Sequence, residues 1–178
     1  MRKAALVLIA LVSLTLSAVA KAGESAKMHV PPAASAELAQ IKSLAGRWSG
    51  TSQEVNGASQ PARVEYRVTS GGSAVVETLF AGTDHEMVSV YHDRNGKLDI
   101  THYCILGNQP ELALTSATPG RFELSLAADS NINTASEPHM HALTLAWADA
   151  DHLTQTWTFY EQGKAAGATT IILAREQK

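Results

Sequence analysis

Lys97-Leu-Asp-Ile-Thr-His-Tyr-Cys-Ile-Leu-Gly-Asn-Gln-Pro110 begins as an alternating strand and ends in residues typical of a turn. Successive side chains of a β-strand point to opposite faces of the sheet. One face of this strand therefore carries Leu98, Ile100, His102 and Cys104. Because half of these side chains are apolar, we expect the face to be buried. A histidine and the chain's only cysteine are then predicted to point into the core.

A second stretch, His139-Met-His-Ala-Leu-Thr-Leu-Ala-Trp147, has the same character. By the same alternation, one face carries His139, His141, Leu143, Leu145 and Trp147. The sequence thus predicts two histidine-bearing strands that face the interior. Buried imidazoles are either hydrogen-bonded parts of the structure or parts of a binding site, and the function depends on which.

Most of the chain after Gly46 reads as short strands separated by turn residues such as Asn56-Gly57, Asn95-Gly96 and Pro119-Gly120. No pattern typical of a crossover helix separates the strands, so a parallel sheet is not expected. We predict an all-β fold, a closed up-and-down antiparallel β-barrel of about ten strands with one short N-terminal helix, because closure removes unpaired edge strands. The expected strands are Arg47–Gln53, Ala62–Thr69, Ala74–Phe80, Glu86–Asp93, Leu98–Cys104, Glu111–Ala117, Arg121–Ala127, His141–Trp147, Leu153–Tyr160 and Ala168–Arg175.

The expected helix runs from Ser35 to Ala45. Ser35 is a favourable N-cap, and Leu38 and Ile41 recur at helical spacing. Gly46 is expected in the C′ position that ends many helices.

Residues 1–22 resemble an export signal. Arg2 and Lys3 form a basic start, and the apolar run from Ala4 to Leu16 is shorter than the ~20 residues of an ordinary membrane span. Small residues allow cleavage after Ala20 or Ala22, and we favour Ala22. We therefore expect an exported protein, periplasmic or secreted, with no stable membrane anchor after cleavage.

The remaining chain divides into a flexible leader, residues 23–34, and one barrel domain, residues 35–178. Removing Arg2, Lys3 and Lys21 takes the formal net charge from −3 to −6, which argues against nucleic acid as a partner. A single cysteine excludes an intramolecular disulfide.

The stretch Leu44-Ala-Gly-Arg-Trp48-Ser-Gly50, with a short helix before it and strands after it, resembles the calycin superfamily of lipocalins, fatty-acid-binding proteins and nitrobindin-like haem barrels. The resemblance implies that Trp48 closes one end of the barrel and stacks with an arginine near the last strand, here Arg175. The segments around Thr101 and Asp151 also resemble exported bacterial lipocalin-like proteins of unknown function. That likeness implies the fold and no activity.

The two histidine strands carry the first candidate site. His102 with Cys104, and His139 with His141, each place two ligands on one face of a strand. Imidazole and thiolate suit zinc, copper or haem iron, so His102 and His141 are candidate metal ligands. The alternative is that the histidines are hydrogen-bonded core residues and Cys104 is a small buried hydrophobe.

Three further polar groups are candidates for the interior: Glu77, Tyr91 and Gln155. Alternation leaves open whether Glu77 points inward and takes a partner such as Arg67 or a histidine, or outward into solvent. Gln155 shares a face with Trp157 and is expected inside, where it needs hydrogen-bond partners.

The sequence supports three functional hypotheses. The first is a non-catalytic protein that holds a small, mainly apolar or amphipathic ligand in the barrel, using His102, Cys104, His141, Gln155, Trp157, Glu77 and Tyr91. The second is a haem- or metal-binding barrel, although the nitrobindin-like proximal histidine near the C-terminus has no clear match. The third is a small isomerase or hydrolase with His102 as acid or base, together with Glu77 or His141.

Overall fold

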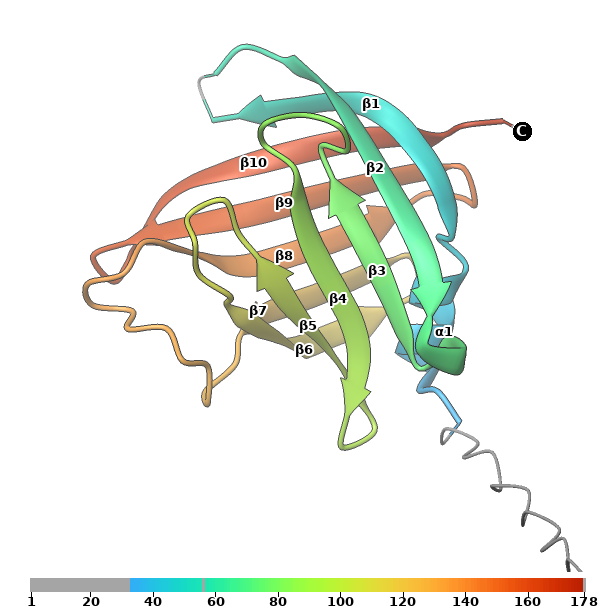
Figure 1. Cartoon of the computed structure of the whole chain (residues 1–178), viewed down its shortest axis with the longest axis horizontal. Helices are drawn as coiled ribbons and strands as arrows, with labels where there is room; N and C mark the ends of the chain where they lie inside the picture. The colour runs from blue at the N-terminus through green and yellow to red at the C-terminus, as the bar shows by residue number, and fades with distance from the viewer. Residues whose placement is uncertain (1–32, 56, 178) are drawn as a thin grey trace, which may run out of the picture.

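The computed structural model describes residues 33–177 apart from residue 56. The expected export signal, residues 1–22, and residues 23–32 of the leader lie outside the described residues. The described part forms one barrel with a helix at one end (Figure 1). Its elements are α1 (Ala36–Lys42), β1 (Gly46–Glu54), β2 (Gln60–Thr69), the 3-10 turn η1 (Ser70–Gly72), β3 (Ala74–Leu79), β4 (Met87–Arg94), β5 (Lys97–Tyr103), β6 (Glu111–Thr118), β7 (Arg121–Leu126), β8 (His139–Trp147), β9 (His152–Glu161) and β10 (Lys164–Arg175).

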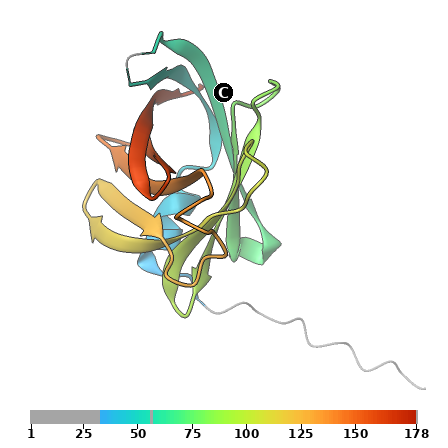
Figure 2. The same ribbon diagram turned by 90° about the vertical axis from the view of Figure 1, so that its left-hand side faces the viewer.

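The ten strands form a closed antiparallel barrel in chain order. Each strand pairs with the next, and β1 pairs with β10 to close the circle. Figure 2 shows the strands curving around a common interior. Closure satisfies the edge groups that an open sheet would expose. The predicted fold class is therefore confirmed.

The strand bounds follow the sequence pattern closely, and the largest difference lies at the start of β10. This strand begins at Lys164 instead of Ala168. Its first residues include Ala165, Ala166 and Gly167, which have little intrinsic preference for a strand. They are part of the strand because Ala165 and Gly167 pair with the end of β9, with Ala166 in a bulge between them.

The helix begins as expected and ends earlier. The Ser35 hydroxyl oxygen accepts a hydrogen bond from the Leu38 N–H at 3.0 Å, while the hydroxyl donates to Asp93 on β4 at 2.7 Å. The last helical residue is Lys42, not Ala45. The predicted C′ role of Gly46 is wrong, because this residue is the first of β1 and has φ +136°.

The helix covers one end of the barrel, which we call the closed end (Figure 1). Trp48 is fully buried there, and its indole N–H donates to the Leu44 carbonyl at 2.9 Å. The Arg175 guanidinium carbon lies 4.2 Å from the centre of the Trp48 ring. This is the stacking that the calycin resemblance implies, and such contacts contribute about 0.5–2 kcal/mol. Arg175 also donates to the carbonyls of Ser43 and Ala45 at 3.0 and 2.9 Å.

The opposite end, which we call the open end, is formed by the loops that follow β1, β3, β5, β7 and β9. Between the two ends, inward side chains fill the barrel with a continuous apolar core. No helix among the described residues is long and apolar enough to span a membrane.

Candidate functional site

A row of polar side chains crosses the barrel interior on four adjacent strands. The register pairs Tyr66 with Glu77, Glu77 with Ser89, and Ser89 with His102. At most 2% of any of these residues is exposed. The row therefore runs from β2 to β5 inside the wall of the barrel, and it places the Glu77 side chain inward, the alternative that alternation left open.

Residues from β9 meet this row from across the interior. The Gln155 amide nitrogen donates to Glu77 Oε1 at 2.5 Å and to the Tyr66 hydroxyl at 2.6 Å. The Trp157 indole N–H donates to Gln155 Oε1 at 3.1 Å. Because an indole N–H can only donate, this contact fixes which end of the amide is the oxygen. The Tyr91 hydroxyl adds a bond to Glu77 Oε2 at 2.9 Å.

Glu77 is a fully buried carboxyl group at the centre of this network. Burial raises its pKa above the ordinary value, and hydrogen bonds from Tyr66, Tyr91, Gln155 and Ser89 oppose that rise. The expected partner of an inward Glu77 was Arg67 or a histidine. Arg67 is instead exposed on the outer face of β2, so the direct partners of Glu77 are neutral donors.

His102 occupies the end of the row nearest the open end. Its Nδ1 lies 3.0 Å from the Ser89 hydroxyl oxygen, and its ring centre is 4.6 Å from that of Trp157. Burial lowers the pKa of His102 to about 4, so the imidazole is neutral near neutral pH. The other ring nitrogen, Nε2, is buried and has no hydrogen-bond partner among the described residues.

A small cavity of about 40 Å³ adjoins His102. Apart from Thr169, its other walls are apolar or aromatic. The lining residues are Leu79, Phe80, Met87, His102, Met140, Trp157, Thr169 and Ile171. A buried polar atom without a partner is thus found on the wall of a largely apolar cavity.

Cys104 is buried, but it does not belong to the strand or to the cavity. It lies in the turn after β5, where its carbonyl accepts from the Gly107 N–H at 2.9 Å. Burial raises the pKa of its thiol. The thiol is therefore held in its neutral form.

The second histidine pair lies outside the barrel wall, contrary to the expectation from alternation. A β-bulge between Met140 and Ala142 shifts the register, so Met140 lines the cavity while His139 and His141 lie on the other face of β8, where His139 is fully buried and His141 is half-buried. His139 Nε2 lies 3.0 Å from His141 Nδ1, within hydrogen-bond distance, and the His141 ring stacks on Tyr160 with centres 3.8 Å apart.

This arrangement separates the proposed metal ligands. His102 lies inside the barrel and His141 outside it, so one metal ion is not held by both. Within residues 33–177, no group of three or more His, Cys, Asp or Glu side chains could hold a metal ion. A cavity of about 40 Å³ also does not hold a porphyrin.

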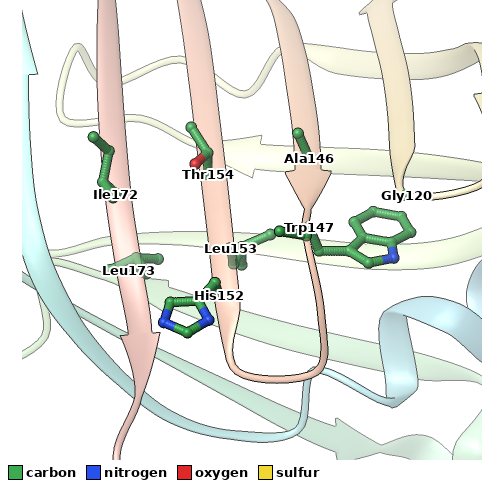
Figure 3. A pocket seen from close by; sticks show the side chains of 9 residues that line it. Gly120, Ala146, Trp147, His152, Leu153, Thr154, Ile172 and Leu173 are labelled. Atoms are coloured by element: carbon green, nitrogen blue, oxygen red, sulfur yellow. The ribbon is translucent and has the colours of Figure 1, made fainter.

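A larger hollow of about 340 Å³ lies on the outer surface near the closed end (Figure 3). Figure 3 shows Ala146, Thr154 and Ile172 side by side on neighbouring strands, with Trp147 next to Gly120. Its histidine, His152, is exposed and bonded to Asp149 at 2.9 Å. The hollow lacks converging buried polar groups, so the cavity at His102 is the stronger candidate.

Sequence reasoning missed two members of the polar row, Tyr66 and Ser89. The alternation of Ala62, Val64 and Tyr66 with charged residues could have indicated that Tyr66 points inward. Ser89 lies between two valines and gave no such signal. Its role arises from its pairing with Glu77 and His102.

Comparison with protein-family models and with curated proteins gives no match. Among solved structures, the chain is similar to a protein of unknown function from the DUF3598 family of Nostoc punctiforme, with a TM-score of 0.57 and 12% sequence identity. The match covers 77% of this chain and 49% of that one, so the chain spans about half the length of that protein. A redesigned β-barrel matches with a TM-score of 0.38 and 11% identity, over 77% of this chain and 95% of the design. At such identities the first likeness concerns the barrel fold alone.

Proposed function

We propose that this protein binds a small, mainly apolar ligand, or the apolar end of a larger one, in the cavity beside His102. The observation that carries the proposal is the buried Nε2 of His102, which has no hydrogen-bond partner in the part of the chain that the structure describes and belongs to a residue of the cavity wall. Buried polar atoms are normally hydrogen-bonded. A polar group of the ligand would satisfy this nitrogen while its apolar part contacts Trp157 and Ile171.

The size of the cavity limits what it can hold. One water molecule needs roughly 10–15 Å³ of such space, so about 40 Å³ admits only a few non-hydrogen atoms. Phe80, Met87 and Met140 form part of its wall and are only half-buried. Methionine side chains adapt readily to a ligand, so these two residues provide a route by which a longer molecule can extend toward the surface.

The chemistry of His102 favours binding over catalysis. A general base is most effective when its pKa lies near the working pH. Burial holds the pKa of His102 near 4, which makes it a weak base at neutral pH. A neutral imidazole with one free nitrogen is instead suited to orient a ligand by a hydrogen bond.

Two further features support an exported lipocalin-like carrier as the setting of this function. The Trp48–Arg175 stacking at the closed end agrees with the calycin resemblance. Residues 1–22 resemble an export signal in their basic start and short apolar run. Together they favour a periplasmic or secreted protein that binds its ligand outside the cytoplasm.

The experiment is a titration of the mature protein with 2-propanol, followed by NMR of the methyl groups of Met87 and Met140 and of the Trp157 indole. We expect saturable shifts at all three residues. Ile171→Phe fills the cavity and should abolish them, whereas Ile172→Phe changes the neighbouring exposed residue and should not. Shifts that persist unchanged in Ile171→Phe would overturn the proposal.

The same preparation gives a second measurement. Native mass spectrometry of protein purified from its exporting host would detect a ligand that co-purifies. An organic adduct that is lost in Ile171→Phe and kept in Ile172→Phe would support the proposed site. An adduct retained equally by both variants would place the ligand elsewhere.

A further inference from the structure

We infer that Glu77 determines which ligands the cavity accepts: ionised Glu77 makes His102 Nε2 a hydrogen-bond acceptor, and protonated Glu77 makes it a donor. This inference rests on the proposed function. It follows from the row Glu77–Ser89–His102, in which each residue pairs directly with the next across adjacent strands.

The surroundings of Glu77 fix the direction of its hydrogen bonds. Trp157 orients the Gln155 amide so that its NH₂ group faces Glu77 and Tyr66. The Tyr91 hydroxyl donates to the other carboxylate oxygen. The groups that meet Glu77 from β2, β4 and β9 are therefore donors, and no lysine or arginine contributes to its pKa within the described structure.

Ser89 lies between this carboxyl group and the histidine: it is the register partner of Glu77 on β4, and its hydroxyl oxygen is 3.0 Å from His102 Nδ1. Its hydroxyl carries one hydrogen, which it donates either to Glu77 or to His102 Nδ1. When Glu77 is ionised, the hydrogen goes to the carboxylate, and the Ser89 oxygen accepts from Nδ1–H at 3.0 Å. A neutral imidazole has one N–H, so Nε2 then carries only a lone pair.

Protonation of Glu77 reverses the direction of the hydrogen bonds from Glu77 through Ser89 to His102. One proton from solvent or ligand binds Nε2, the Nδ1 proton passes to Ser89, and the Ser89 proton passes to Glu77. The net change is one proton taken up, and His102 stays neutral with its hydrogen now on Nε2. The cavity wall thereby changes from acceptor to donor without any movement of the backbone.

The other titratable groups around the row do not compete for this proton. Burial raises the pKa of Tyr66 and of Tyr91 well above 10, so both remain protonated. Burial also keeps His102 from taking a second proton above a pH of about 4. Because burial raises the pKa of Glu77 itself, its titration moves toward neutral pH.

Ligand selectivity follows from this relay. Acetone can only accept a hydrogen bond, so it requires Nε2–H and protonated Glu77. The similarly sized 2-propanol can donate or accept, so it suits both states. We expect acetone affinity to fall at least tenfold as the pH rises through the Glu77 transition, while 2-propanol affinity stays within about twofold.

The test is NMR of the ligand-free protein between pH 4.5 and 9, with ¹³C at the Glu77 carboxyl and ¹⁵N at the His102 ring. We expect the carboxyl transition and the change of imidazole tautomer to share one midpoint. In Ser89→Ala the carboxyl transition should remain while the tautomer no longer follows it. In Glu77→Gln, whose amide can donate to Ser89 as a protonated carboxyl does, the Nε2–H tautomer and acetone binding should persist at every pH.

Two results would overturn the inference: a Glu77 transition that leaves the tautomer unchanged, or no Glu77 transition in this pH range. The tautomer measurement needs no ligand, so it is separate from the proposed function. If neither acetone nor 2-propanol shifts Met87 and Met140 while the tautomer follows Glu77, the proposed binding function fails and the relay stands.

Discussion

Gln155 on β9 and Glu77 on β3 meet across the barrel interior at 2.5 Å, although they lie 78 residues apart in the chain. This bond joins opposite walls of the barrel through one amide group. The same amide also contacts Tyr66 and Trp157, so three other side chains depend on its position. The interior is thus organised by a polar centre within an apolar core.

Replacing Gln155 with leucine should destabilise the fold by about 2–4 kcal/mol, because the buried Trp157 N–H and Glu77 carboxyl would lose partners while remaining shielded from water. Urea denaturation monitored by tryptophan fluorescence measures the change. Thr156→Val, on the neighbouring outward position, serves as control and should stay within about 0.5 kcal/mol. A loss below about 1 kcal/mol for Gln155→Leu would show that the network is not needed for stability.

His102 should make stability fall as the pH is lowered from 6.5 to about 4. The folded-state pKa of His102 is near 4 against an ordinary 6.5, so in this window the unfolded chain binds a proton that the folded chain does not. At roughly 1.4 kcal/mol per pH unit, the loss amounts to about 3 kcal/mol.

The check for this pH effect is urea denaturation at several pH values. His102→Gln should flatten the pH dependence in the window, whereas His85→Gln, at an exposed position, should reproduce the wild-type slope. Glu77 affects the free energy of unfolding in the opposite direction. Because its pKa is raised, above pH 4.5 the folded state keeps a proton that the unfolded chain has lost, so stability falls as the pH rises. It is present in both variants, so their difference isolates His102. Equal slopes would contradict the assignment of His102 as a buried neutral imidazole.

Arg175→Met should cost about 1–3 kcal/mol of unfolding free energy. The guanidinium stacks on Trp48 and donates to the carbonyls of Ser43, Ala45 and Ala150. Its loss therefore removes the stacking and three hydrogen bonds. Thermal or urea unfolding measures the change, and Arg63→Met on the exposed face of β2 is the control. Equal stability of the two variants would remove the structural role of Arg175.

Gly50→Ala should prevent closure of the barrel or destabilise it by more than about 3 kcal/mol. A Cβ at Gly50 would lie 1.9 Å from the Ile172 carbonyl oxygen, so the β1–β10 pairing would have to separate. Gly167→Ala is the matched control, because a Cβ there meets nothing within 4 Å. Circular dichroism and urea unfolding would show the difference, and a stable Gly50→Ala variant would contradict this close approach.

The sequence predicted the barrel well because its strands depend on local alternation. Leu98, Ile100 and His102 point inward as their spacing requires. The alternation rule failed at His141, because the bulge beside Met140 inserts one residue into the strand. No residue type in that stretch indicates a bulge.

The candidate site was only partly predictable for a related reason. The alternation of residues in β9 was enough to predict that Gln155 and Trp157 point inward. The direction of Glu77 depended on which face of β3 packs against the core. Ser89 is important because of the residues opposite it on neighbouring strands. Such partners are set by the register of the sheet, which a single strand does not encode.

The pairing of the first strand with the last also has a consequence for synthesis. A chain that has not yet produced β10 leaves β1 and β9 as unpaired edges, since both lie against β10 in the finished barrel. Unpaired edges are templates for association with other chains. Nascent or truncated chains that end before Lys164 should therefore aggregate or require a chaperone. Only when β10 has been synthesised and has paired with β1 and β9 are these two edges protected from association with other chains.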